Sequence, residues 1–308
     1  MAPNGNGGIL GRAAGLAAWL TVVPAVVIAT ACGVDTSSRT GGPTAPTVVI
    51  GAADTVESEL VARLYAGALG ASGRSTELVL GLGDQADRLA ALDADRVSLV
   101  PEHTGRLLHR FDPTADATEA EDVYDALSRS LPQGLSVSEY APADDRSALV
   151  LTEQQAESWG ASSVADLAPR CSTLSLHASD DFASDAGALD RLQARYGCTF
   201  AEVVPTRSPA GATRELAVVG ASPVRGTTAA DPVIAQDELV VLTDDEGAFT
   251  AQNVIPFFRS GVLTADDVRS LSVVLQLSTD DLTAMAARVR DGEISSADAA
   301  GVWLEEHA

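Results

Sequence analysis

The sequence predicts an α/β fold built as two lobes. Short β-branched runs alternate with segments of helical periodicity, the pattern of an α/β architecture with mostly parallel sheets. The 308 residues are 46% hydrophobic and 20% charged, which is typical of a globular chain. The patterned body spans roughly 260 residues, which is large for one sheet and suits two lobes.

The elements follow in order from the residue pattern. Residues 47–51 (TVVIG) form a β-branched run between a proline and a glycine, so we predict a strand there. Residues 56–69 repeat apolar side chains at helical spacing and predict a helix. By the same criteria, further strands are expected at 77–82, 96–100, 147–151, 172–176, 201–204 and 239–243. Further helices are expected at 84–92, 118–131 and 186–196.

Three more helices are predicted to close the chain. Each begins after a residue suited to capping the free N–H groups of a first turn. These predicted caps are Thr264, Thr279 and either Ser295 or Ser296. We find no internal repeat.

The N-terminus is predicted to be an export signal that ends in a lipid attachment site. Residues 13–31 are uncharged and mostly apolar, and Pro24 interrupts the run. Small residues lead into Cys32, and this segment resembles a bacterial lipobox, in which the cysteine receives diacylglycerol and becomes the new N-terminus. The alternative is a lone buried cysteine after a simple signal anchor. We expect a signal peptide over 1–31, a flexible tether over 32–47, and an extracytoplasmic, membrane-anchored protein.

Cys171 and Cys198 are the two cysteines that remain after Cys32. Thiols oxidise outside the cytoplasm, so this pair predicts a disulfide. The alternative, a structural zinc site, would need more ligands than two cysteines without nearby histidines.

The charge and the motifs exclude several classes of function. Acidic residues outnumber arginines 43 to 20, lysine is absent, and the net charge is -23. Such a chain repels phosphate backbones, so we expect no nucleic-acid partner. The sequence contains no G-x-S-x-G, H-E-x-x-H or G-x-x-x-x-G-K-[ST] motif. We therefore expect no enzyme activity, no catalytic residue, no cofactor and no metal.

Four segments of the chain resemble the osmoprotectant-binding proteins of ABC importers. They are residues 48–73, residues 98–107 (SLVPEHTGRL), residues 142–151 followed by 164–168, and residues 237–259 (DELVVLTDDEGAFTAQNVIPFFR). Their order and spacing agree with that family over residues 48–306. The resemblance implies a solute-binding protein that captures glycine betaine, choline or a related quaternary amine and delivers it to ABC permease subunits.

The resemblance also implies a fold, namely a two-lobed, periplasmic-binding-protein-like fold of type II with two hinge strands. One lobe would combine residues 48–144 and 250–308, and the other would span 145–249. The hinges would lie at 138–148 and 241–251. The ligand would bind in the cleft between the lobes, and hinge closure would enclose it.

The aromatic cage that such proteins build around a quaternary ammonium has no counterpart at the matching positions. Those positions are Thr55, His103, Ser147 and, approximately, Gly226. A quaternary ammonium offers no hydrogen-bond donor, so its recognition depends on aromatic faces. An altered ligand is therefore expected, such as a more polar cation or an amine that donates hydrogen bonds.

Polar side chains near these positions suit such a ligand. The candidate ligand-binding residues are Asp54, Thr55, Glu57, His103, Thr104, Asp144, Asp145 and Ser147. Structural roles are open for several of them. Asp54 could cap the first helix, Glu57 could lie on its solvated first turn, and Asp144 and Asp145 could be turn residues. His103 could be an ordinary interior or surface histidine.

A second function stays open at this point. A binding-protein fold that has lost its cage could act as a ligand sensor or as an envelope scaffold without transport. Stabilisation by a ligand distinguishes the two, because a working cleft favours the folded, closed form and a scaffold gives no response.

Overall fold

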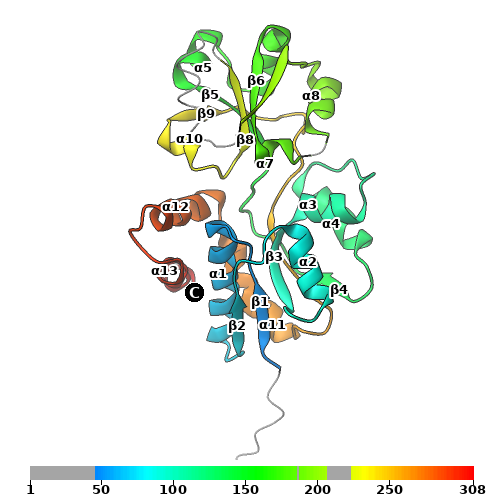
Figure 1. Cartoon of the computed structure of the whole chain (residues 1–308), viewed down its shortest axis with the longest axis vertical. Coiled ribbons are helices and arrows are strands. Elements are labelled where there is room, and N and C mark those ends of the chain that lie inside the picture. The colour runs from blue at the N-terminus through cyan, green and yellow to red at the C-terminus, as the bar shows by residue number, and fades with distance from the viewer. Residues whose placement is uncertain (1–45, 186, 207–222) are drawn as a thin grey trace, which may run out of the picture. The chain divides into compact units, whose positions relative to one another are not determined.

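The computed structural model describes residues 46–185, 187–206 and 223–308 (Figure 1). The predicted signal peptide, Cys32 and nearly all of the predicted tether lie outside these residues. The described part holds two five-stranded sheets, each with its own helices. We call each sheet with its helices a lobe. The predicted two-lobed α/β class is confirmed. No described helix combines the length and the apolar character needed to cross a bilayer.

The first lobe contains the beginning and the end of the described chain. Its strand order is β2 (Thr76–Val79), β1 (Val48–Gly51), β3 (Leu99–His103), β10 (Val254–Arg259) and β4 (Leu135–Val137). Its helices before the second lobe are α1 (Val56–Ala71), α2 (Gln85–Asp93), α3 (Thr104–Phe111) and α4 (Ala120–Ser130). Those after it are α11 (Ala265–Ser270), the 3-10 helix η2 (Leu271–Gln276), α12 (Thr279–Arg290) and α13 (Ser296–His307).

The second lobe is built from the middle of the chain. Its strand order is β7 (Glu202–Thr206), β6 (Ser175–Ser179), β8 (Val224–Thr228), β5 (Ser147–Thr152) and β9 (Leu239–Val241). Its helices are α5 (Glu153–Trp159), α6 (Val164–Leu167), the 3-10 helix η1 (Ala168–Thr173), α7 (Asp180–Ala183), α8 (Ala188–Tyr196) and α10 (Val233–Gln236).

The expectation of mostly parallel sheets is wrong, because each sheet is mixed. β1 runs parallel to β2 and β3, and β6 runs parallel to β7 and β8. The other four described pairings are antiparallel, two around β10 and two around β5. β5 and β10 directly follow the two segments that pass from one lobe to the other. The residue pattern predicts that a strand is present, but it does not indicate whether a strand that follows such a connecting segment runs parallel or antiparallel to its neighbours.

Most predicted elements appear, with shifted ends. β3 begins three residues later than predicted and continues through Pro101, Glu102 and His103. The predicted strand at 172–176 is β6, which starts at Ser175 because η1 occupies the residues before it. The caps Thr264 and Ser295 are confirmed, whereas α12 is capped by Ser278 and not by Thr279.

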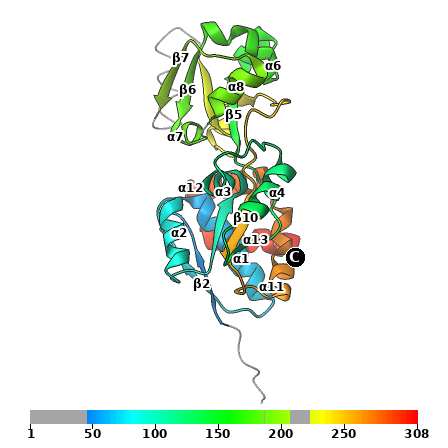
Figure 2. The ribbon, with the colours of Figure 1, turned by 90° about the vertical axis from the view of Figure 1, so that its right-hand side faces the viewer.

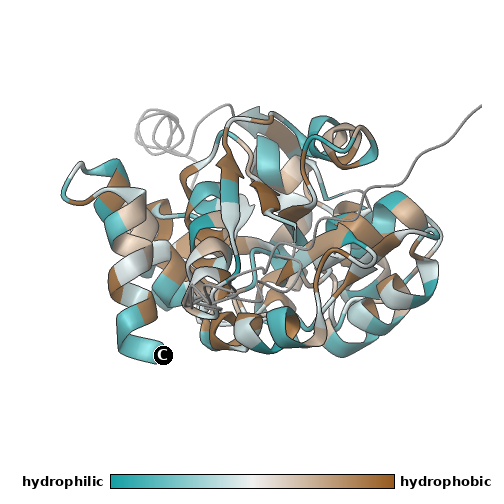
Figure 3. Ribbon diagram, turned by 90° about the horizontal axis from the view of Figure 1, so that it is seen from below, coloured by the Kyte–Doolittle hydropathy of each residue, from teal (hydrophilic) through white to brown (hydrophobic). Residues whose placement is uncertain are grey.

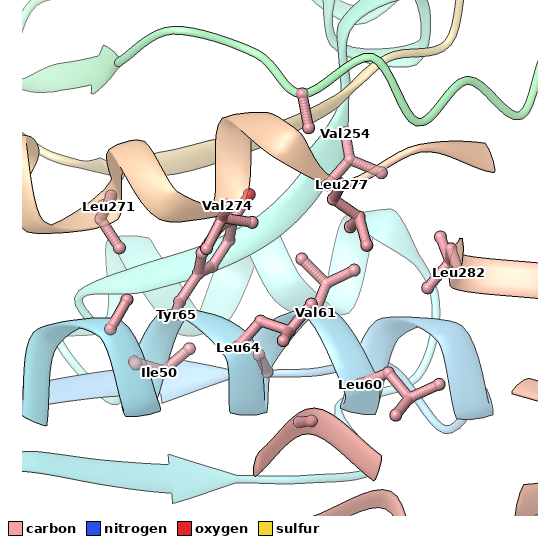
Figure 4. Packing of buried hydrophobic residues seen from close by; sticks show 14 of the residues in the cluster. Ile50, Leu60, Val61, Leu64, Tyr65, Val254, Leu271, Val274, Leu277 and Leu282 are labelled. Atoms are coloured by element: carbon pink, nitrogen blue, oxygen red, sulfur yellow. The ribbon is translucent and has the colours of Figure 1, made fainter. Parts of the chain in front are cut away.

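The core of the first lobe surrounds α1. The apolar repeat that predicted this helix, which includes Leu60, Val61 and Leu64, is buried against η2 and α12 (Figure 4). α13 packs on the same helix. Figure 3 shows hydrophilic and hydrophobic residues alternating along α13, whose buried side includes Trp303. Burial of these apolar side chains from both ends of the chain stabilises the lobe.

A disulfide links Cys171 in η1 to Cys198, which follows Gly197, the C-cap of α8, with a Cα–Cα distance of 5.3 Å. This pairing agrees with the sequence prediction. Both cysteines are buried in the core of the second lobe.

The chain passes between the two sheets twice, over residues 138–146 and 242–253 (Figure 2). These two connecting segments meet at an isolated antiparallel bridge between Asp144 and Asn253. The Asp144 carboxylate accepts a hydrogen bond from the Gln252 N–H at 2.8 Å and another from the Arg146 N–H at 2.9 Å. One acidic side chain therefore holds both connections together.

Candidate functional site

The cavity that contains the predicted residues has a volume of about 470 Å³. It is lined from the first lobe by the loop after β1 and the start of α1, by α2, by the end of β3 with α3, by the start of β10, and by α12. From the second lobe it is lined by Asp145, α7 and residues 228–236. A second cavity of similar volume, between Tyr65 and Leu275 of the first lobe, contains none of the predicted residues.

Three of the predicted residues lie where the chain passes from β1 into α1: Asp54 and Thr55 in the loop, and Glu57 in the first turn of the helix. Thr55 lines the cavity and caps α1, because its Oγ1 accepts a hydrogen bond from the Ser58 N–H at 3.3 Å. The capping role considered for Asp54 therefore belongs to Thr55. Asp54 itself is exposed and is not part of the cavity wall. Glu57 lines the cavity and forms an ion pair with Arg290 of α12.

His103 and Thr104 lie where β3 ends and α3 begins, and they have different environments. His103 lines the cavity, and burial together with the charges of Arg106 and Arg88 holds its pKa well below the ordinary value of 6.5. Its ring is therefore neutral at neutral pH and adds no positive charge. Thr104 is buried away from the cavity wall, where its Oγ1 donates to the Ala251 carbonyl and accepts from the Asn253 N–H.

Of the remaining three predicted residues, one lines the cavity and two do not. Asp145 lines the cavity. Asp144 is occupied in joining the two connecting segments, and Ser147 is buried at the start of β5 opposite Thr228. Neither Asp144 nor Ser147 is part of the cavity wall. The structure thus brings Thr55, Glu57, His103 and Asp145 together around one cavity, and leaves the other four predicted residues outside its wall.

Asp145 has an unusual environment for a carboxylate. Its Oδ2 lies 3.8 Å from an Arg106 nitrogen, and its Oδ1 accepts a hydrogen bond from the Ala230 N–H at 3.4 Å. Burial raises the pKa of Asp145 from 3.8 to about 6, against the opposing effects of a hydrogen bond from Thr228 and the charge of Arg106. Asp181 of α7 raises this pKa further through its negative charge.

Sequence reasoning missed most of the charged residues of the wall. They are Arg88, Glu102, Arg106, Asp181, Asp231 and Arg290. Arg88 and Glu102 form a buried ion pair at 2.7 Å, and Glu102 also accepts a hydrogen bond from Gln85 at 3.2 Å. Glu102 and Arg106 flank the His103–Thr104 pair that the prediction used, so the PEHTGR segment itself was the available signal.

No Phe, Trp or Tyr occurs among the described residues that line the cavity. At Gly226, the fourth cage position, an added Cβ would lie 2.8 Å from the ring of Phe182. Phe182 is buried in the core of the second lobe and is not part of the cavity wall. Among its described residues the wall therefore offers carboxylates and no Phe, Trp or Tyr ring. The described residues also contain no cluster of three His, Cys, Asp or Glu side chains placed to hold a metal ion.

Comparisons with known proteins agree with this architecture. The sequence profile of a family described as the substrate-binding domain of the ABC-type glycine betaine transport system matches residues 46–306. A sequence search among curated proteins gives no match.

Solved structures resemble the fold of this chain at low sequence identity. A glycine betaine/carnitine/choline ABC transporter structure superposes with a TM-score of 0.72 and 19% identity, covering 84% of this chain and 98% of the other. Apo YehZ from Escherichia coli gives a TM-score of 0.69 and 20% identity, with coverages of 85% and 99%. A choline-binding protein in complex with choline gives a TM-score of 0.52 and 14% identity, with coverages of 84% and 88%.

Proposed function

The chain belongs to the family of substrate-binding domains of ABC-type glycine betaine transport systems, and on that premise we propose that it captures a small cationic or zwitterionic solute in the cavity described above. The main observation in support of this proposal is the composition of the cavity wall. It combines side chains of both lobes, and it contains five carboxylates against three arginines. An excess of carboxylates attracts cations through charge.

Capture would proceed by closure of the two lobes, the first comprising residues 48–144 and 250–308 and the second residues 145–249. Two connecting segments that meet at one bridge, Asp144 with Asn253, are consistent with hinge motion around that point. Asp145 lies next to this bridge and lines the cavity, so closure of the lobes would change the surroundings of its carboxylate. The closed, loaded protein would then deliver its solute to ABC permease subunits.

The protein would work outside the cytoplasm, where the substrate-binding proteins of ABC importers act. Lipid attached to Cys32 would hold it at the membrane, and residues 32–47 would serve as its tether. Mass spectrometry of the membrane-extracted protein tests this part of the proposal, because a diacylated Cys32 at the N-terminus changes the mass of the first peptide. An intact N-terminal segment with an unmodified cysteine would contradict it.

Thermal unfolding of the chain from residue 33 onwards, measured against a panel of amines, tests the capture of a solute. The panel contains glycine betaine, choline, carnitine, ergothioneine, polyamines and basic amino acids. We expect at least one of them to stabilise the protein, by about 2.7 kcal/mol at a concentration one hundred times its Kd. The same compound should reduce the radius of gyration in small-angle scattering as the lobes close.

The competing function predicts the opposite result. A sensor of an unrelated compound or an envelope scaffold would show no response to any of these amines, although its unfolding transition would prove that the protein is folded.

A further inference from the structure

We propose that the solute is a basic amino acid, whose carboxylate binds Arg106 and whose N–H-bearing cationic groups face the carboxylates of the second lobe. This inference rests on the proposed function, because it assumes that the cavity captures a small solute. It adds the chemical class of that solute, which differs from a quaternary amine in having N–H donors.

The two walls of the cavity differ in charge. The first lobe contributes three arginines (Arg88, Arg106 and Arg290) and two glutamates (Glu57 and Glu102), an excess of one positive charge. Among the described residues, the second lobe and the connecting segment contribute to the wall three carboxylates and no basic side chain; the carboxylates are those of Asp145, Asp181 and Asp231. A ligand with an anionic end and cationic groups, carrying one net positive charge, complements both walls.

Arg106 is the arginine best placed to receive the ligand carboxylate. Arg88 and Arg290 are each paired with a glutamate of their own lobe. Arg106 instead lies 3.8 Å from Asp145, which is longer than the 2.7 Å of the Arg88–Glu102 pair. A guanidinium binds a carboxylate through two parallel N–H donors, so a ligand carboxylate can take over this looser contact. Asp145 is then free to accept hydrogen bonds from the ligand ammonium group.

The carboxylates of the second lobe suit N–H donors. Asp181 is exposed on α7 and forms no ion pair with any described residue. The Asp231 carboxylate is oriented by the Val233 N–H, at 2.9 Å, and by the Thr227 hydroxyl. Hydrogen bonds between a charged donor and a carboxylate are about twice as strong as neutral ones, and a quaternary ammonium can form none.

The size and the neutral groups of the cavity also agree with such a ligand. A volume of about 470 Å³ falls within the range typical of small-molecule sites, about 300–1,000 Å³, and leaves room for an extended side chain. The neutral ring of His103 does not oppose a cation. The part of the wall that the structure describes holds no Phe, Trp or Tyr ring, the aromatic faces that would favour a methylated ammonium instead.

Isothermal titration calorimetry with matched ligands tests the proposal. The protein from residue 33 onwards is titrated at pH 7.5 with arginine, with agmatine, which lacks the carboxylate, and with citrulline, which lacks the side-chain charge. Lysine is compared with Nε-trimethyllysine, and ornithine and glycine betaine complete the series. We expect arginine, ornithine or lysine to bind tightest, and each matched analogue to bind about tenfold or more weakly, because it loses a charged hydrogen bond.

Two pairs of variants test which side chains bind the carboxylate and the cationic groups of the ligand. Arg106→Gln is compared with Arg110→Gln, an exposed arginine one helical turn further along α3. Asp181→Asn is compared with Asp180→Asn, an exposed neighbour that is not part of the cavity wall. Arg106→Gln should weaken arginine about tenfold while changing agmatine little, and Asp181→Asn should weaken both ligands. The two control variants should bind like the unchanged protein.

The outcomes separate this inference from the function on which it rests. Binding of glycine betaine or Nε-trimethyllysine without binding of the basic amino acids overturns the inference and leaves solute capture intact. Equal loss of arginine and agmatine in Arg106→Gln overturns the placement of the carboxylate. No binding of any compound of the series, on protein with a cooperative unfolding transition, overturns the inference. Only if the amine panel of the thermal-unfolding test also gives no response is solute capture overturned.

Discussion

At the scale of single residues, Asp145 lies both beside the bridge that joins the two connecting segments and on the wall of the cavity. It follows Asp144 of the Asp144–Asn253 bridge directly, its carboxylate lies 3.8 Å from Arg106 of α3, and the negative charge of Asp181 of α7 acts on it. Burial favours the uncharged acid more strongly than Arg106 favours the anion, so the pKa is about 6. A carboxyl that titrates so close to neutrality makes the stability of the folded protein depend on pH.

The sign of this dependence can be predicted. Between the ordinary pKa of 3.8 and the folded value of about 6, the folded state binds more protons at Asp145 than the unfolded state does. The resulting stability is complete below pH 3.8 and is lost as the pH rises through about 6. Asp145→Asn stays uncharged, so its free energy of unfolding relative to the unchanged protein should rise between pH 4 and pH 7, by on the order of 2 kcal/mol.

Urea unfolding without ligand at both pH values measures this difference. Asp180→Asn, an exposed carboxylate on α7, serves as the control and should show no such trend. A difference between Asp145→Asn and the unchanged protein that stays constant from pH 4 to pH 7 would contradict the raised pKa.

Half of the predicted site residues lie on the cavity wall, and the reason is geometric. The PEHTG segment was a sufficient signal for His103, because a polar residue at the end of a strand faces the same edge as the neighbouring strand ends. The same segment gave no means of distinguishing His103 from Thr104, whose hydroxyl is instead used in backbone contacts to Ala251 and Asn253. Arg290 and Asp231 come from elements far away in the chain, so only the fold brings them to this cavity.

At the scale of elements, the Arg88–Glu102 pair fixes α2 against β3. Glu102 is almost fully buried, and Arg88 also donates a hydrogen bond to the Gly83 carbonyl at 3.1 Å. Removing one partner of a buried pair leaves an uncompensated charge, which costs more than removing both.

A single and a double variant check this role. Arg88→Met alone should lower the free energy of unfolding by about 3–5 kcal/mol, because it leaves the Glu102 carboxylate buried without its counter-charge. Adding Glu102→Gln to that variant should recover most of the loss. Urea unfolding measures the free energy of unfolding of both variants. The control is Arg96→Met, which changes an exposed arginine of the same region and should alter that free energy by no more than about 0.5 kcal/mol. Equal losses in the single and double variants would show that the charge of Glu102 needs no partner.

β10 shows what an element prediction from sequence misses. Its six residues, VIPFFR, include Pro256, and a proline argues against a central strand because it donates no ladder hydrogen bond. In the structure Pro256 lies opposite Pro101 of β3, beyond the end of the pairing with β4, so no ladder donor is needed there. The helix face of α1 was predicted correctly because its apolar period depends only on local spacing, whereas the position of β10 depends on the whole sheet.

At the scale of the whole molecule, the net charge of -23 acts against compactness. Like charges on a folded chain repel each other more than on an expanded one, and salt screens this repulsion. The absence of lysine leaves 20 arginines to balance 43 acidic residues.

We therefore expect added salt to stabilise the protein. Raising sodium chloride from 0.05 M to 0.5 M at pH 7.5 should raise the Tm, which calorimetry measures directly. The rise should shrink near pH ~4.5, where many carboxyl groups are protonated and the repulsion is weaker. A Tm that falls with salt at pH 7.5 would mean that paired charges, such as Arg290 with Glu57, matter more than the net repulsion.

The position of β10 has a consequence for how the chain reaches its folded form. β4 joins the first sheet only through β10, and the core around α1 needs side chains from Leu271 to Trp303. The strands of the second lobe, by contrast, lie within one continuous stretch, from Ser147 to Val241. A chain that emerges N-terminus first, from a ribosome or an export channel, therefore presents all strands of the second sheet before the first sheet can close. The first lobe, whose strands β1, β2 and β3 emerge early, therefore completes its fold last. Until β10 has emerged, its sheet is incomplete.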